Sequence, residues 1–391
     1  MSIKKYLSPI DPDALGFIPS QRTLLLGAVA KVYVPGGNLP SVPKNGIVIL
    51  GVGEDRGAED NAGCAAAPNE IRAQLYQLAV PAKNVKITDY GNLVLGQTQE
   101  DTYYALAQVS AAVLAKNATL IVLGGSQDLT FALYKAYEIL NKVMNLTTID
   151  PRFDLENNDT TTSRTWLRDI VMQSTNVLYF HSNIGYQTYF VGQSYVDLMD
   201  ELKFEAYRLG EVRQDMNIAE TALRDADLVS VDLSAIRQSD APALGKPSAH
   251  GFYGEEFCQL MQYAGMSDRT HCLGIFELNP LYDNRNQTTQ MVAQGLWYFI
   301  DSFLHRKHDN PQLYPESCRH YYVHLEEQDL DLDFYESKLT GRWWMKVPCH
   351  NEKQRKIYGD SQFFPCTRDD YQQAMQNEIP NRWWHFFKRM N

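Results

Sequence analysis

Eight short apolar runs recur between residues 47 and 276, and stretches with helical periodicity separate them. The runs are Ile47–Val52, Val85–Tyr90, Thr119–Leu123, Leu146–Ile149, Val177–His181, Phe204–Leu209, Leu228–Leu233 and Cys272–Phe276. Runs of this length and composition are typical of strands that are buried on both faces. Because parallel strands need crossover helices, the alternation predicts helices on both sides of the sheet. The predicted fold is α/β, a three-layer α/β/α sandwich around an eight-stranded, mainly parallel sheet.

The chain around this unit has a different character. A helix over Thr288–Arg306 is predicted to close the α/β unit, because apolar residues recur there at core-facing intervals. Aromatic pairs follow, at Tyr321-Tyr322, Trp343-Trp344 and Trp383-Trp384. A β-hairpin is expected within Tyr321–Val347, and Thr367 is expected to cap a final helix. The predicted divisions are an N-terminal extension at 1–43 that wraps the sheet edge, an α/β domain at 44–308, and an aromatic-rich C-terminal extension at 309–391.

Three of the apolar runs lead into polar clusters. The clusters are Gly124 to Asp128, Asp150 to Asp154, and Ser230 to Arg237. Ligands of parallel α/β sheets bind outside the carboxyl ends of the strands, so the three clusters are predicted to face one crevice. Turn aspartates taken alone are more often structural, because they satisfy nearby backbone groups. A ligand site and a set of structural turns both remain open at this point.

The order of these clusters resembles the ureohydrolase family, which includes arginase, agmatinase and formimidoylglutamase. In that family the corresponding turns hold two manganese ions. Further blocks extend the resemblance over about Ile47 to Arg306; they are Gly51 to Gly57, Gly63 to Arg72, Ala241 to Gly251, and Glu277 to Pro280. The resemblance, which is nearest in character to formimidoylglutamase, implies an arginase-like fold, hydrolysis of a C–N bond in a linear amidine, and a homo-oligomer.

The residues that the resemblance assigns to manganese are only partly kept. Asp150, Asp154 and Asp232 stand at ligand positions of the family. The other positions have changed: Gln127 and Arg152 replace His, and Ser234 and Arg237 replace Asp. Two neighbouring dications need bridging carboxylates and imidazoles to generate hydroxide near neutral pH. We therefore expect the dinuclear site to be lost, leaving no cofactor, or at most one weakly bound Mn²⁺ on the three aspartates.

Two arginines beside three carboxylates suggest a replacement for the metals. Because arginine stays protonated and can pair bidentately, Arg152 and Arg237 are expected to form an ion-pair network with the aspartates. Glu277 is expected at the pocket wall, either facing a cationic group or paired with an arginine. His181, placed at the end of its predicted strand, either reaches the crevice or is a satisfied core group. The candidate ligand-binding residues are Gln127, Arg152, Ser234, Arg237, Glu277 and His181.

Charge and hydropathy exclude several partners. The formal charge of −11 argues against binding to a phosphate backbone, so no nucleic acid is expected. The apolar run Thr23–Val34 is interrupted by Lys31 and is too short to span a bilayer. The six cysteines are scattered without metal-site spacing. These observations predict a cytoplasmic protein without a membrane partner.

Three functional hypotheses remain from the sequence. The first is a pseudoenzyme that keeps the ureohydrolase fold and binds a small polar ligand or a protein partner. The second is a working metal-dependent hydrolase of linear amidines. The third is a structural subunit whose C-terminal extension forms the interface of a homo-oligomer, since paired tryptophans serve equally as interface anchors and as core.

Overall fold

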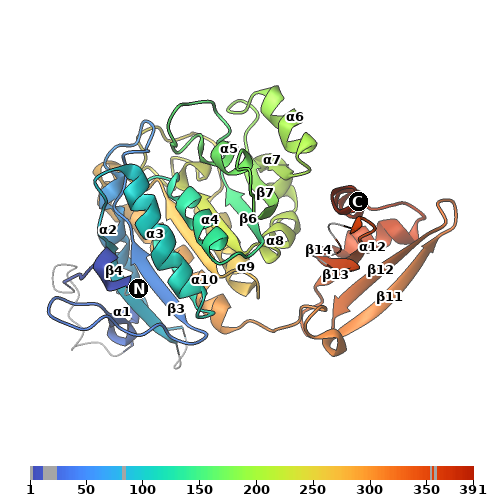
Figure 1. Cartoon of the computed structure of the whole chain (residues 1–391), viewed down its shortest axis with the longest axis horizontal. Helices are drawn as coiled ribbons and strands as arrows, with labels where there is room; N and C mark the ends of the chain where they lie inside the picture. The colour runs from blue at the N-terminus through green and yellow to red at the C-terminus, as the bar shows by residue number, and fades with distance from the viewer. Residues whose placement is uncertain (1–2, 12–23, 82–84, 353–354, 356–358) are drawn as a thin grey trace.

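A ten-stranded sheet lies at the centre of the larger part of the molecule (Figure 1). The computed structural model describes residues 3–11, 24–81, 85–352, 355 and 359–391. In sheet order the strands are β1 (Leu7–Ser8), β4 (Ile87–Leu93), β3 (Ile47–Gly51), β5 (Thr119–Leu123), β10 (Cys272–Phe276), β9 (Leu228–Asp232), β6 (Met144–Ile149), β7 (Leu178–Tyr186) and β8 (Glu205–Arg208), and β2 (Lys31–Val32) also pairs with β4. The eight predicted strands are confirmed and run parallel. The sheet has two strands more than predicted, because the N-terminal residues add β1, which is antiparallel, and β2.

Helices cover both faces of this sheet, as predicted. One face packs against α1 (Leu26–Val29), α2 (Ala67–Leu75), α7 (Leu209–Gln214), α8 (Asn217–Arg224), α9 (Gly254–Met266) and α10 (Gln287–Leu304). The other packs against α3 (Gln99–Leu114), α4 (Leu129–Ile139), α5 (Trp166–Val171) and α6 (Gln193–Glu201). Successive strand residues point to opposite faces. Ile47 and Ile49 accordingly enter one core, whereas Val48 and Leu50 enter the other.

The C-terminal residues form a second unit with its own sheet (Figure 1). Its antiparallel strands lie in the order β11 (Cys318–Leu325), β12 (Leu330–Ser337), β13 (Trp343–Pro348) and β14 (Ser361–Cys366), followed by α12 (Arg368–Met375) and α13 (Asn381–Met390). The predicted hairpin is thus part of a larger sheet. Thr367 caps a helix as predicted, since its hydroxyl accepts the Asp370 N–H at 3.2 Å, but that helix, α12, is not the final one because α13 follows it. None of the described helices is both long and apolar enough to cross a membrane.

The aromatic residues of this second unit are mostly core residues. Trp383 is fully buried, and Trp343 and Trp344 are only 7% and 3% exposed. The core also includes Phe180 of β7, so it is continuous with the edge of the large sheet. Tyr322 and Trp384, at 60% and 41% exposure, are the members of the pairs that remain available to a partner.

Buried cations fix the second unit against the edge of the first. Arg382 of α13 forms an ion pair with Glu205 of β8 at 3.0 Å. Arg224 of α8 donates to the carbonyl oxygen of Trp343 at 2.9 Å. Both guanidinium groups are largely removed from solvent, so each needs its partner.

The sheet register brings the predicted site together. Strands β5, β10, β9 and β6 are consecutive neighbours, and Leu123, Ile275, Val231 and Ile149 form one row across them. The residues after this row therefore emerge at the same edge of the sheet. They carry all three polar clusters and Glu277.

Candidate functional site

A narrow crevice opens at this edge, with a cavity of about 50 Å³. Its lining includes five predicted site residues: Arg152, Asp154, Asp232, Ser234 and Glu277. A cavity of that volume accommodates a few water molecules or a small polar group. The structure thus brings residues from three different strand ends to one small site.

Glu277 forms the floor of the crevice together with the Gln127 turn. The backbone N–H of Gln127 donates to Glu277 Oε1 at 2.8 Å, and Asn61 Nδ2 donates to Oε2 at 2.8 Å. Burial, followed by the charge of Asp232, raises the pKa of Glu277 well above its usual range. Its backbone has φ of +68°, a left-handed conformation that only a few non-glycine residues adopt. Neutral amides, not an arginine, therefore hold this carboxyl group.

The three aspartates lie close enough together to affect one another's ionisation. Burial raises the pKa of Asp150 to about 7, with the charge of Asp232 as the second cause. Burial also raises the pKa of Asp154 well above normal, and Asp150 adds to the effect. The pKa of Asp232 is raised by burial as well. Like charges in a dry site oppose ionisation, so this cluster favours shared protons or a cation.

Each aspartate also has one oxygen committed to a protein donor. Asp150 Oδ1 accepts the Arg152 backbone N–H at 2.7 Å, and Asp154 Oδ2 accepts the indole N–H of Trp166 at 2.9 Å. Asp232 Oδ1 accepts the Ser234 backbone N–H at 2.6 Å. These bonds fix the carboxylates but occupy oxygens that bridging ligands would need.

The two arginines do not form the predicted ion-pair network. Arg237 Nε instead pairs with Asp240 at 2.9 Å, and its guanidinium lies over the ring of Tyr253 at 3.8 Å. The chain turns away from the crevice here because Ile236 forms a β-bridge with Phe252.

Arg152 stays beside the crevice, where it stacks over Phe190 at 4.2 Å. It forms no ion pair within 4.0 Å in the described part of the chain, although its charge lowers the pKa of Asp232. The prediction is therefore wrong for Arg237, and Arg152 acts on the aspartates without direct pairing.

His181 lies inside the sheet, away from the crevice. Strand β7 continues beyond the predicted end at His181 to Tyr186, so His181 is paired in register with Leu146 in mid-sheet. Its Nδ1 lies 3.3 Å from the carbonyl oxygen of Leu146, and its ring contacts that of Phe204 edge-on. Burial lowers the pKa of His181 to about 3. Of the two interpretations, the neutral core group is the one that the structure supports.

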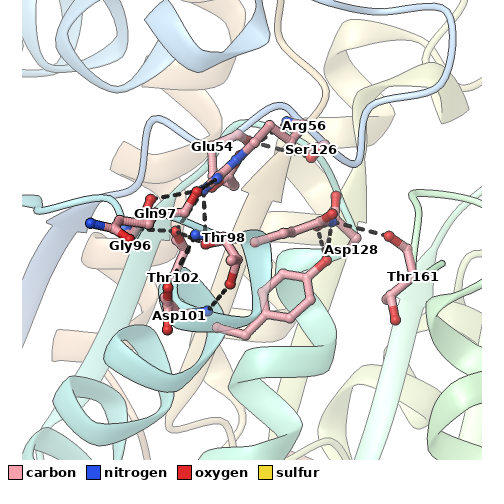
Figure 2. Close-up of polar contacts among 12 residues, drawn as sticks. Glu54, Arg56, Gly96, Gln97, Thr98, Asp101, Thr102, Ser126, Asp128 and Thr161 are labelled. Carbon is pink, nitrogen blue, oxygen red and sulfur yellow. Dashed lines mark hydrogen bonds and ion pairs between the residues drawn. The ribbon is translucent and has the colours of Figure 1, made fainter.

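The buried carboxyl group of Asp128, the residue after Gln127, connects this turn to α3 (Figure 2). Asp128 accepts hydrogen bonds from the Tyr103 hydroxyl and from Gln99 Nε2, both on the first turns of α3. Burial raises the pKa of Asp128. Gln127 itself donates to Ser230 Oγ at 3.4 Å, and its buried Oε1 has no hydrogen-bond partner among the described residues.

The loop after β3 is connected to the start of α3 by Arg56, which also forms an ion pair with Glu54 (Figure 2). Arg56 Nε donates to Glu54 Oε1 at 2.8 Å. Its terminal nitrogens donate to the carbonyl oxygens of Gln97 and Thr98 at 2.8 and 3.1 Å. These contacts join the loop after β3 to the start of α3, next to the turn that carries Gln127.

The mouth of the crevice is formed by residues that the sequence analysis did not assign. Asp60 pairs with Lys246 at 2.7 Å and with Arg164 at 3.1 Å, and Glu59 accepts the Thr162 hydroxyl at 2.5 Å. All but Thr162 line the cavity, as do Asn61 and Ser163. Their sequence signal is weak, because contacts between the loop at 59–61 and the loop at 162–164 depend on the fold.

The donor set does not fit a pair of manganese ions. Imidazole ligands are lacking, because His181 lies elsewhere and Gln127 and Arg152 occupy the other positions. Across the described part of the chain, no group of three or more His, Cys, Asp or Glu side chains is arranged to hold a metal ion. The remaining donors are oxygens, which suit hard cations and cannot reproduce the mixed nitrogen and oxygen set of the family.

The strand order and the loops at four adjacent strand ends define an arginase-like α/β protein. The sequence model of the Arginase family matches residues 45–300, well over half of the chain. The chain belongs to the arginase family. The matched residues end before the C-terminal unit begins.

Similar proteins include several formimidoylglutamases. Those of Staphylococcus haemolyticus and Staphylococcus aureus are each 26% identical, over 277 and 271 residues, and the matches cover 66% of this chain and 86% of each relative. A crystal structure of Trypanosoma cruzi formiminoglutamase with Mn²⁺ has a TM-score of 0.63 at 21% identity and covers 68% of this chain and 97% of that one. Bacillus subtilis formimidoylglutamase gives 0.63 at 17% identity, with coverages of 76% and 99%. These structures establish the shared fold.

Proposed function

We propose that the crevice of this chain binds a small polar ligand and does not hydrolyse linear amidines, because its donor set does not fit two manganese ions. The observation that carries the proposal is the donor set: three carboxylates remain, Arg152 and Ser234 line the crevice, and Gln127 is fully buried behind Glu277. Hydrolysis in a dinuclear site depends on two dications that lower the pKa of a shared water. Arg152 places a permanent positive charge beside Asp232, where it repels a dication.

The groups that remain free favour a ligand with both donors and acceptors. Ser234 Oγ and Gln127 Oε1 are buried and have no hydrogen-bond partner in the described structure. Unpaired buried polar atoms are costly, so a ligand that satisfies them gains affinity. The mouth carries both signs of charge, with Arg164 and Lys246 beside Asp60. A small zwitterionic molecule matches this arrangement.

The experiment is a metal and activity measurement on protein expressed and purified with manganese. We expect no stoichiometric manganese by inductively coupled plasma mass spectrometry and no formamide release from formimidoylglutamate. The triple variant Gln127→His, Arg152→His, Ser234→Asp should gain manganese. Arg237→Asp is the matched control and should not, since Arg237 points away from the crevice. Two manganese ions per wild-type chain with manganese-dependent hydrolysis would overturn the proposal.

A second candidate is a hydrolase that uses one hard cation. This candidate is favoured by Asp150 Oδ2, a buried oxygen that has no hydrogen-bond partner among the described residues. Ser234 Oγ and Gln127 Oε1 are in the same situation. Asp150, Asp154 and Asp232 would hold the ion only after their side chains move closer together, because no three such groups in the described structure are already arranged to do so. Calorimetric titration with Mn²⁺ distinguishes the candidates: one site per chain that is abolished in Asp232→Asn, together with amidine hydrolysis, supports the hydrolase.

A further inference from the structure

A second and larger cavity, of about 440 Å³, is lined by residues at the carboxyl ends of β7 and β8 and by residues of α7. Figure 1 shows where these elements lie. The cavity shares no lining residue with the crevice. Three arginines, Arg208, Arg213 and Arg237, contribute to its wall. Glu211 is the only carboxylate among its lining residues. A positively charged hollow on a chain of net charge −11 is unusual enough to call for an explanation.

Two of the arginines are held rigidly on one tyrosine. The guanidinium groups of Arg213 and Arg237 lie 3.9 and 3.8 Å from the ring centre of Tyr253. Arg213 Nε pairs with Glu256 at 2.9 Å, and Arg237 Nε pairs with Asp240 at 2.9 Å. Both carboxylates also accept backbone N–H groups where α9 begins. The start of α9 thus fixes both guanidinium groups before any ligand arrives, which lowers the entropy lost on binding.

Arg208 and Arg237, which both line the cavity, keep donors that no protein acceptor uses in the described structure. Arg208 Nε donates to the Tyr186 hydroxyl at 3.0 Å, and no carboxylate lies within 4.0 Å of Arg208 in the described structure. Among the described residues, the terminal nitrogens of Arg237 donate to no protein acceptor, because only Nε is engaged. A guanidinium group carries five N–H donors in a planar fork. Several of these donors are therefore available to a ligand from two arginines on different elements.

The shape and chemistry of the cavity indicate the kind of ligand. A volume of about 440 Å³ is within the range of small-molecule sites. Planar guanidinium forks bind carboxylate and phosphate oxygens bidentately. Tyr186 and Tyr189 add ring surface against which a carbon skeleton can pack, whereas the ring of Tyr253 is already covered by Arg213 and Arg237.

We propose that this cavity is a binding site for a small organic anion, whose carboxylate or phosphate group is held by Arg208 and Arg237. Arg213 supports the site through Tyr253, and the rings of Tyr186 and Tyr189 contact the rest of the ligand. This inference goes beyond the function proposed for the crevice and concerns a different cavity. If the anion does not bind in this cavity, the manganese and hydrolysis measurements on the crevice are unaffected. If those measurements contradict the function proposed for the crevice, the anion-binding test is unaffected.

The test is isothermal titration calorimetry of the full chain with inorganic phosphate, glutarate and adenosine monophosphate. We expect at least one probe to bind with a dissociation constant of about 1 mM or tighter. Binding should weaken as salt is raised, because the contact is between charges. Phosphate binding without glutarate binding assigns a phosphate ligand, and the reverse assigns a carboxylate ligand.

Variants then locate the binding. Arg208→Met and Arg237→Met should each weaken binding about tenfold or more, since each removes a charged hydrogen-bond donor. Arg208→Lys keeps the charge and should restore part of the affinity. Arg319→Met, an exposed arginine on the C-terminal sheet, is the matched control and should bind as the wild type does. Failure of all three probes to bind, or unchanged affinity in folded Arg208→Met and Arg237→Met, would overturn the proposal.

Discussion

The burial of His181 predicts a specific pH dependence of stability. Burial lowers its pKa from 6.5 to about 3. A histidine that is neutral in the folded chain and titrates normally in the unfolded chain contributes stability above pH 6.5, and that stability is lost as the pH falls. At about pH 5, the unfolded chain gains a proton that the folded chain does not, which costs about 2 kcal/mol. At about pH 7.5 this cost is close to zero, because His181 is then mostly neutral in both the folded and the unfolded chain.

The assay compares urea unfolding of the wild type and His181→Gln at the two pH values. Other titrating groups cancel in the difference, so the stability gap between the two proteins should narrow by about 2 kcal/mol on acidification. Leu339→Ala serves as control, because Leu339 is exposed and carries no titratable group, and its gap should stay constant. A gap for His181→Gln that does not change with pH would show that His181 titrates normally, as a residue of an open crevice would.

Three further predictions concern packing and charge. Trp166→Phe removes the donor to the buried carboxyl group of Asp154, and urea unfolding should show a loss of about 1–3 kcal/mol. Arg382→Met leaves Glu205 buried without its partner and should destabilise by about 3–5 kcal/mol; the double variant with Glu205→Gln should recover part of this in the same assay. Removing residues 309–391 uncovers the shared core at the sheet edge and should give insoluble protein in expression trials, whereas a soluble monomer would instead identify the C-terminal unit as an oligomer interface.

The sheet was largely predictable because its central strands are buried on both faces and appear as continuous apolar runs. Strand β7 was predicted too short, since the polar residues Ser182 and Asn183 interrupt its run. Both lie buried in the sheet because they find partners there: Ser182 donates to Glu205 at 3.0 Å, and Asn183 donates to Thr148 at 3.0 Å. Strands β1 and β2 have two residues each, which is too few to show any periodicity.

The candidate site was predictable in position but not in its interactions. Asp150, Asp154 and Asp232 were predicted to lie together because ligands of parallel sheets bind at the carboxyl ends of the strands, and these residues lie at two such ends. The direction of Arg237 depends on the bridge between Ile236 and Phe252, a pairing between loop residues that no local pattern reveals.

The features that make the crevice look like an active site are also required by packing alone. A side chain at Gly125 would place its Cβ 2.0 Å from the carbonyl oxygen of Glu54, and one at Gly124 would lie 2.2 Å from the ring of Phe276. The left-handed backbone of Glu277 aims its carboxyl group at the Gln127 amide, whether or not a metal is present. These positions hold the loops of this chain in place by packing alone. Positions such as Gln127 therefore say more about the chemistry of the site. The buried Oε1 of Gln127 has no hydrogen-bond partner among the described residues, and a ligand can satisfy it.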